Sequence, residues 1–136
     1  MTNYQYLLIL TLNIFMKHQN EIWLINLDPT IGAEIQKTRP AIIVNDNSIG
    51  KLPLKIVVPI TDWKDRFEVA PWMIKIEPNK QNNLSKTSAI DCFQIRCVSE
   101  HRFVQQLGSI DEQIGNEIKI ASVSYTHLTL PTKRIV

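Results

Sequence analysis

The chain has 136 residues, enough for one domain with a core of its own and too few for two well-packed domains. Hydrophobic residues make up 44% of it and charged residues 21%, a balance that excludes disordered and fibrous classes. The formal net charge of +2 does not by itself predict a nucleic-acid partner, so a site for a polyanion would need locally clustered basic side chains.

The N-terminal residues contain an apolar run, Tyr6 to Phe15, that is too short to span a membrane. No basic segment precedes this run and no small-residue cleavage site follows it, which argues against a signal peptide. Met16 offers a second start, directly before polar residues that lead into a strand pattern. We therefore expect residues 1–15 to be an upstream extension, with a weak anchor as the alternative, and we expect no membrane partner.

The first predicted strand, residues 21–27 (EIWLINL), alternates in polarity and is rich in β-forming residues. The next twelve residues, 28–39, predict a loop, and loops of this length in compact domains are usually functional. Pro40 fixes its own φ and favours an extended Arg39, so we expect the loop to end where a second strand, PAIIVND, begins. Arg39 would then lie at the rim of a sheet.

The rest of the chain predicts more short strands and then a helix. Residues 54–61 and 72–78 predict the third and fourth strands, residues 87–99 a long fifth strand, and RFVQQLG a short sixth. The segment SIDEQIGNEIKIA then carries apolar residues at helical spacing, and Ser109 stands where a capping box would begin. We therefore predict a mainly β fold, a small barrel of antiparallel strands with a C-terminal α-helix.

Two cysteines, Cys92 and Cys97, fall in the predicted fifth strand, five positions apart. An odd spacing in a strand sends the two side chains to opposite faces, so we expect no disulfide and no shared metal between them. They are typical of reduced packing residues in a cytosolic protein.

The last fourteen residues, 123–136, continue neither the period nor the composition of the predicted helix. VSYTHLTLPT also resembles the translation of an adapter used in sequencing, so we interpret residues 123–136 as a read-through scar and the helix as truncated. The domain would then comprise residues 16–122. Without Lys133 and Arg134, the 15 basic residues fall to 13 and equal the 13 acidic ones.

Candidate chemistry lies at the ends of the predicted strands. The sequence has no glycine-rich phosphate loop, no paired CxxC and no serine-nucleophile motif, so we expect no cofactor and no metal site. A curled sheet could bring five polar residues to one rim: Arg39, Thr61, Asp91, Gln94 and Arg96. Gln94 and Arg96 would share a face of the fifth strand because they are two positions apart.

Basic residues on the two long loops could supply the local positive potential that the whole chain lacks. They are Lys37 beside Arg39 in the first loop, and Lys64 and Arg66 in the loop DWKDRFEVAP, where Trp63 is a candidate for base stacking. Each has an ordinary alternative. Loop lysines and arginines are usually only solvated, Thr61 could cap a turn, and Asp91 and Gln94 could merely satisfy buried groups.

Several segments, in order, carry a resemblance to a known family: EIWLINLDPT, TRPAIIV, PIT, SAIDCFQIR and VSEHRF. They resemble the MazF/PemK family of toxin endoribonucleases, and the match covers Glu21 to about Ala121. The resemblance implies an SH3-like barrel of the MazF/CcdB type, a cytoplasmic homodimer that cuts single-stranded RNA without a metal. It also implies a cognate MazE/PemI-like antitoxin as partner.

The resemblance further implies catalytic roles for Arg39 and Thr61 and RNA contacts for Gln94 and Arg96. Some plasmid-type members carry a histidine in the first loop, where this chain has Ala33 beside Glu34. Those members also carry an acidic residue directly before the late glutamine, where this chain has Phe93, with Asp91 two positions earlier. The general base is therefore open between Asp91 and Glu34.

The reaction that fits is attack of a ribose 2′-hydroxyl on the neighbouring phosphate, which leaves a 2′,3′-cyclic phosphate and a 5′-hydroxyl end. The alternative is a CcdB-like toxin of the same fold that traps a protein target such as gyrase and cuts nothing. The TRP and PIT segments favour the nuclease, because a pure binder has no chemical need of them. We also expect the first loop and the Trp63 loop to form one groove shared by RNA and antitoxin.

Overall fold

The computed structural model describes residues 2–5, 17–49 and 52–126 of the chain. The expected extension is therefore described only at residues 2–5, and the suspected scar only up to Thr126, within the last turn of a helix. The expectations for residues 6–15 and 127–136 lie outside the described residues. Within the described ranges, no helix is long and apolar enough to cross a membrane.

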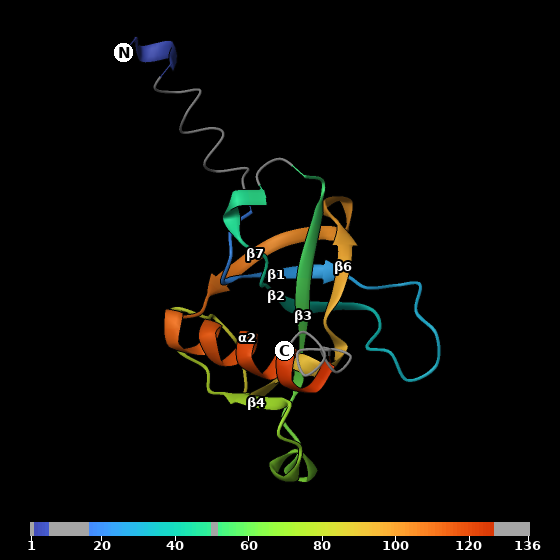
Figure 1. The fold of residues 1–136 in the computed structure, drawn as a ribbon. Coiled ribbons are helices and arrows are strands. Elements are labelled where there is room, and N and C mark those ends of the chain that lie inside the picture. The colour runs from blue at the N-terminus through green and yellow to red at the C-terminus, as the bar shows by residue number, and fades with distance from the viewer. Residues whose placement is uncertain (1, 6–16, 50–51, 127–136) are drawn as a thin grey trace, which may run out of the picture.

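The described residues form a curled antiparallel sheet with one long helix at its open end (Figure 1). The strands are β1 (Glu21–Asn26), β2 (Thr38–Ile43), β3 (Leu54–Asp62), β4 (Met73–Ile76), β5 (Ser88–Asp91), β6 (Arg96–Ser99) and β7 (Phe103–Ser109). Their order in space is β4, β5, β3, β2, β1 and β7, and β6 also pairs with β3. The predicted mainly β fold with a C-terminal helix is confirmed.

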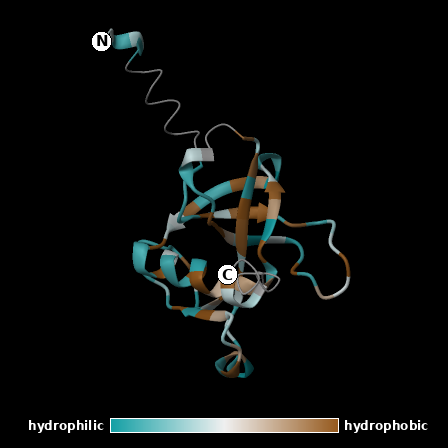
Figure 2. Cartoon of the chain, viewed as in Figure 1, coloured by the Kyte–Doolittle hydropathy of each residue, from teal (hydrophilic) through white to brown (hydrophobic). Residues whose placement is uncertain are grey.

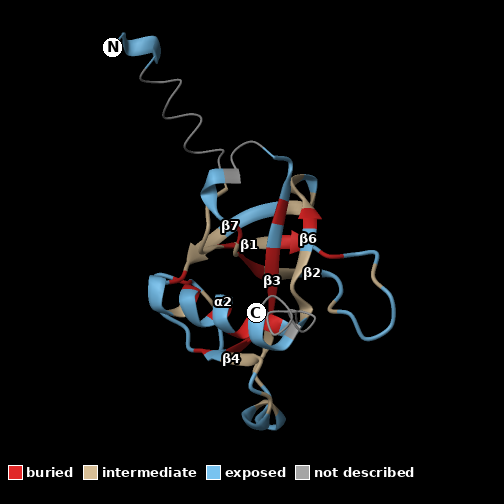
Figure 3. Ribbon diagram, viewed as in Figure 1, coloured by how far each residue is buried: buried red, intermediate tan, exposed pale blue. Residues whose placement is uncertain are grey.

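Apolar side chains of the central strands bury the core on both faces of the sheet. The last three residues of β2, Ala41 to Ile43, are all buried, as are Val57 and Val58 of β3. They divide between two apolar clusters, one towards the helix and one beneath the first loop. Figures 2 and 3 show apolar and buried residues concentrated on β2 and β3, as expected for strands covered on both faces. All four residues of β5 are also buried, whereas β6 buries only Val98.

The C-terminal helix, α2 (Glu112–Thr126), closes the end of the barrel near β4 (Figure 1). The helix buries Ile118 and Ala121 in the apolar cluster that faces it, and Ile114 is partly buried beside them. The predicted cap was two residues off, because Asp111 and not Ser109 accepts the backbone N–H of Ile114, at 2.8 Å. Ser109 instead ends β7.

The prediction of one long strand over residues 87–99 is wrong. The segment forms β5, a 3-10 turn η3 (Cys92–Gln94) and then β6. Both strands pair with β3, but between the pairs Ile60–Ile90 and Val57–Arg96 β3 advances three residues while its partner advances six. The turn η3 takes up the surplus.

Because the strand is broken, Cys92 and Cys97 do not lie on opposite faces of one strand, as the sequence predicted. Cys92 begins η3 and is buried in the core, whereas Cys97 lies in β6 and is exposed. Both are free thiols, so the expectation of unpaired cysteines is confirmed on different geometry. The remaining short 3-10 turns are η1 (Asn47–Ile49), η2 (Asp65–Val69) and η4 (Glu100–Arg102).

Candidate active site

Arg39 and Thr61 line the same cleft at the end of the paired strands β2 and β3. These strands pair antiparallel from Ile43–Val57 to Ala41–Pro59, and two residues further along each strand the register places Arg39 beside Thr61. The cleft has a volume of about 190 Å³ and is open to solvent. Its lining comprises Arg39, Pro40, Ile60, Thr61, Asp62, Leu84, Ser85, Lys86 and Ser88. Two segments 22 residues apart thus meet where the sequence predicted a sheet rim.

Arg39 is held at one of its nitrogens only. Its Nε donates a hydrogen bond to the backbone carbonyl of Gln36 at 3.3 Å, and it makes no ion pair with any described residue. The guanidinium is planar and remains protonated, so its two terminal nitrogens can grip an anion bidentately. Thr61 adds a hydroxyl to the same cleft. The pair therefore offers a cation and a hydrogen-bond donor to one phosphate.

Four polar residues of this cleft were missed by sequence reasoning: Asp62, Ser85, Lys86 and Ser88. The Lys86 ammonium lies 2.9 Å from the Asp62 carboxylate, and both side chains are about half exposed or more. The signal for Asp62 was its place directly after Thr61. The segment NKQNNLSK, in contrast, reads only as a turn, and its approach to Arg39 depends on the pairing of β5 with β3.

A second polar group forms around η3 and faces the first loop. Asp91 is 3% exposed. One of its carboxylate oxygens accepts the backbone N–H of Phe93 at 3.1 Å, and the other accepts the Nε2 of Gln94 at 3.0 Å. The Oε1 of Gln94 then accepts the backbone N–H of Ile35 in the first loop, at 2.8 Å. Burial raises the pKa of Asp91, against the opposing effect of these hydrogen bonds.

Two arginines fix the first loop to the barrel through its backbone. Arg96 donates from Nη2 to the carbonyls of Leu27 and Ile35, at 3.3 and 3.5 Å, while its Nη1 lies 3.5 Å from Glu34. Arg102 donates from Nη1 to the carbonyls of Asn26 and Asp28. Burial lowers the pKa of Arg96, which still remains protonated at neutral pH.

The five expected rim residues therefore fall into two groups. Arg39 and Thr61 share the cleft, while Asp91, Gln94 and Arg96 contact the first loop. The loop connects the groups, because Ile35 binds Gln94 and its neighbour Gln36 binds Arg39. Gln94 and Arg96 both contact the first loop, as their predicted shared face would allow. They do not share a strand, however, because Gln94 lies in η3 and Arg96 begins β6.

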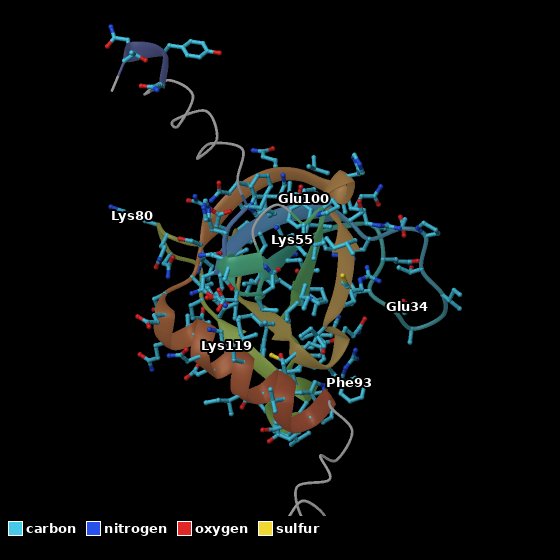
Figure 4. The ribbon with its side chains drawn as sticks, turned by 45° about the horizontal axis from the view of Figure 1, so that its top comes forward. Glu34, Lys55, Lys80, Phe93, Glu100 and Lys119 are labelled. Atoms are coloured by element: carbon cyan, nitrogen blue, oxygen red, sulfur yellow. The ribbon has the colours of Figure 1, made fainter. Side chains whose placement is uncertain are left out.

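The two candidate bases lie outside the cleft lining. Asp91 is buried and both its oxygens are engaged. Glu34 is exposed on the first loop, where it accepts the N–H of Ile31 and pairs with Arg96. Figure 4 shows Glu34 on the loop that extends away from the barrel, well apart from the helix.

The predicted RNA-binding residues of the two loops adjoin the cleft residues in sequence. Lys37 precedes Arg39 by two residues at the end of the first loop, and Lys64 follows Thr61 by three. Figure 1 shows the first loop and η2 extending from the molecule in different directions. The cleft lining includes neither Lys37 nor Trp63, so the groove shared by the two loops stays a prediction.

All three tryptophans are half-buried, and two of them pack on the core as predicted. Trp23 packs on the cluster beneath the first loop, and Trp72 packs on the cluster under the helix. Trp63 stands outside both clusters, edge-on to Phe67 at 5.7 Å between ring centroids and 5.0 Å from the Lys75 ammonium. Arg66 lies over the ring of Phe67, at 5.4 Å from its centroid.

Residues 18–121 match the sequence model of the PemK-like, MazF-like toxins of type II toxin–antitoxin systems. Endoribonuclease PemK of Escherichia coli is 33% identical over 104 residues, which cover 74% of this chain and 74% of the relative. Endoribonuclease MazF of Staphylococcus epidermidis is 31% identical over 111 residues, 78% of this chain and 91% of the relative.

Solved structures of similar shape support the same fold. A crystal structure of MazF from Deinococcus radiodurans superposes with a TM-score of 0.65 at 17% identity, and covers 81% of this chain and 96% of that one. An endoribonuclease in complex with its cognate antitoxin, from a mycobacterial species, gives a TM-score of 0.63 at 14% identity, with coverage of 81% and 94%. At these identities the likeness concerns the fold.

Proposed function

The chain belongs to the family of PemK-like, MazF-like toxins of type II toxin–antitoxin systems, and we propose that it is an endoribonuclease that cuts single-stranded RNA in the cleft of Arg39 and Thr61. The observation that carries the proposal is the meeting of these two residues, from separate strands, in one open cleft. Their chemistry suits a phosphodiester. A guanidinium and a hydroxyl can stabilise the charge that develops on phosphate oxygens in the transition state.

The reaction is an internal transfer at phosphorus. The 2′-oxygen of the ribose bonds to phosphorus as the bond to the 5′-oxygen breaks, which yields a 2′,3′-cyclic phosphate and a 5′-hydroxyl end. The proton of the 2′-hydroxyl passes to a base, and the leaving 5′-oxygen takes up a proton. Arg39 grips the non-bridging oxygens with its two terminal nitrogens, and Thr61 donates one further hydrogen bond.

Glu34 is the more accessible of the two candidate bases. Its carboxylate is about half exposed on the first loop, so an RNA strand can reach it, although its oxygens accept from Ile31 and pair with Arg96. Asp91 would have to release Phe93 or Gln94 and move out of a buried position before it could take a proton from RNA. Lys37, Trp63, Lys64, Arg66, Gln94 and Arg96 remain the proposed RNA-binding residues.

The proposed partners follow from the family. We expect a homodimer in the cytoplasm, where RNA is available, neutralised by a cognate MazE/PemI-like antitoxin that covers the cleft. Apolar side chains that are exposed in the single chain agree with an assembly, since Ile120 is 67% exposed and Val104 61%. Sedimentation of the protein at micromolar concentration should give twice the mass of one chain.

The test is incubation of the purified protein with defined single-stranded RNA in EDTA, followed by mapping of the new ends. We expect internal cuts with 2′,3′-cyclic phosphate and 5′-hydroxyl ends, and no cuts in DNA of the same sequence, because DNA lacks the attacking hydroxyl. Cleavage that needs added metal would overturn the proposed mechanism. A folded protein that cuts no RNA but traps a protein target such as gyrase would establish the CcdB-like alternative.

A further inference from the structure

Two sets of hydrogen bonds, joined by the backbone of Ile35 and Gln36, connect the buried Asp91 to the guanidinium of Arg39. Asp91 accepts the Nε2 of Gln94 at 3.0 Å, and the Oε1 of Gln94 accepts the N–H of Ile35 at 2.8 Å. The next residue, Gln36, offers its carbonyl to the Nε of Arg39 at 3.3 Å. Each bond in this chain has a defined donor and acceptor, so the orientation at one end depends on the other.

We propose that Asp91 and Gln94 are positioning residues that hold the backbone of Ile35 and Gln36 and thereby orient Arg39 towards the phosphate. The proposal rests on the proposed function for the role of Arg39. It gives Asp91 a task other than proton transfer, and it gives Gln94 a task in addition to its proposed contact with RNA.

The Asp91 end of the chain is a firm support. Asp91 caps η3 through the N–H of Phe93, and the adjacent Cys92 belongs to the core. The turn η3 also packs against α2. A carboxylate that is 3% exposed and bonded twice cannot change rotamer without losing a bond in a buried place, which is costly.

The first loop needs such a support because it extends away from the barrel, as Figure 1 shows. Arg96 holds both of its ends, since one nitrogen of Arg96 reaches the carbonyls of Leu27 and Ile35. Gln94 adds the bond to the N–H of Ile35. The peptide groups on both sides of Ile35 are therefore fixed directly before the carbonyl that Arg39 uses.

The bond from Gln36 determines how Arg39 can act. With Nε engaged, the plane of the guanidinium is set and the two terminal nitrogens are left for an anion. Without that bond, the exposed side chain would sample several rotamers, and the bidentate geometry would be populated only part of the time. Displacement of a catalytic group by about 1 Å can reduce the reaction rate by about a hundredfold.

The first arm of the test reads Arg39 directly, without RNA. In NMR spectra the signal of the Arg39 Nε–H is assigned by its loss in Arg39→Lys. This hydrogen should be protected from exchange with solvent in the unchanged protein and unprotected in Gln94→Ala. Gln106→Ala, at an exposed glutamine of β7, is the matched control and should leave the signal unchanged. Protection that persists in folded Gln94→Ala protein would overturn the proposal whether or not the protein cuts RNA.

The second arm exchanges the two partners. In Asp91→Asn the new amide faces the amide of Gln94, so Gln94 must flip and present a donor to the N–H of Ile35. The double variant with Gln94→Glu restores both bonds, because the asparagine amide donates to the glutamate and the other glutamate oxygen accepts from Ile35. We expect the single variant to reduce kcat about 10- to 100-fold with KM little changed, and the double variant to recover most of it.

The two arms separate the positioning role from the alternatives and from the proposed function itself. A double variant as inactive as Asp91→Asn, although folded, would show that the charge at position 91 acts in the chemistry and would overturn the proposal. If the Arg39 signal responds as expected but the unchanged protein cuts no RNA, the positioning chain stands and the proposed function fails.

Discussion

Arg39 combines a backbone constraint with a side-chain constraint. Pro40 follows it and pairs with Leu24 of β1, which keeps Arg39 in the extended strand β2, and the Gln36 carbonyl fixes its Nε. The sequence TRP predicts the backbone constraint. It does not predict the bond to Gln36, because that bond depends on the fold of the loop that precedes the strand. Thr61 was likewise identified from PIT, although only the β2–β3 register shows that it meets Arg39.

Replacement of Arg39 by alanine should abolish most activity and leave the fold intact. The side chain is partly exposed at the rim and makes one bond to the described residues, so little stability depends on it. Loss of one transition-state donor typically reduces kcat by about 10²–10³-fold. Arg39→Lys should recover little, because lysine keeps the charge but not the planar fork. Single-turnover cleavage of RNA in EDTA measures the effect.

The matched control for this substitution is Lys80→Ala, which removes an exposed cation that does not line the cleft. Figure 4 shows Lys80 and Glu34 on opposite sides of the molecule. Lys80→Ala should cut at the unchanged rate. Full activity in folded Arg39→Ala protein would show that the chemistry lies elsewhere and that TRP is only the entrance to a strand.

Cys92 should make the protein less stable at alkaline pH. Burial raises the pKa of its thiol from 9.0 to about 12. Between these values the unfolded chain has released the proton and the folded chain retains it, so the free energy of unfolding falls as pH rises. From pH 8 to pH 10.5 this loss should reach about 2 kcal/mol. Urea unfolding at the two pH values measures it.

The two cysteines provide the comparison that isolates this effect. Cys92→Ala should lose about 2 kcal/mol less than the unchanged protein over the same interval, even if it is less stable at both pH values. Cys97→Ala, at the exposed cysteine of β6, should behave like the unchanged protein. Equal losses in all three proteins would show that Cys92 ionises as easily when folded as when unfolded.

At the scale of elements, the interruption of the predicted fifth strand was the main surprise. Residues 87–99 contain no proline or glycine, and their composition favours a strand throughout. The break arises because β3 is shared, with β5 on Ile60 to Asp62 and β6 on Leu54 to Val57. Register of this kind is a tertiary property that local propensity cannot reveal. It is also what turns Asp91 and Gln94 towards the first loop.

The packing of one turn against β7 makes Gly108 sensitive to substitution. A Cβ at Gly108 would lie 2.3 Å from the backbone oxygen of Gln81 and 2.9 Å from the backbone of Asn82. This turn cannot easily move, because Ser109 donates its N–H to Gln81 at 3.0 Å and the buried Asn82 donates to the carbonyl of Glu77 at 2.9 Å. Gly108→Ala should therefore cost about 2–3 kcal/mol of unfolding free energy.

Urea denaturation of Gly108→Ala beside Val104→Ala tests this expectation. Val104 is 61% exposed on the same strand, so its truncation should change the unfolding free energy by no more than about 0.5 kcal/mol. An unchanged denaturation midpoint for Gly108→Ala would mean that the turn over residues 79–84 can move away from β7 at little cost.

At the scale of the whole molecule, charge is nearly balanced, so any attraction for RNA depends on where the basic residues lie. Lys37 and Lys64 belong to different strand ends at the cleft, because Lys37 directly precedes β2 and Lys64 follows β3, each within three residues of Arg39 or Thr61 in sequence. The sequence predicted which residues would be basic neighbours of the site. It could not predict that the ends of β2 and β3 meet at one cleft, because that depends on the strand register.

This arrangement predicts a separable contribution of each lysine to RNA affinity. Each phosphate contact on a single strand contributes about 0.7 to the slope of log affinity against log salt. Lys37→Ala and Lys64→Ala should each lower the slope by about 0.7, and the double variant by about 1.4, because the two residues contact different phosphates. Binding to 2′-fluoro RNA, which lacks the attacking hydroxyl, measures affinity without cleavage. Lys80→Ala should keep the original slope, and a double variant no different from either single one would place both lysines on a single phosphate.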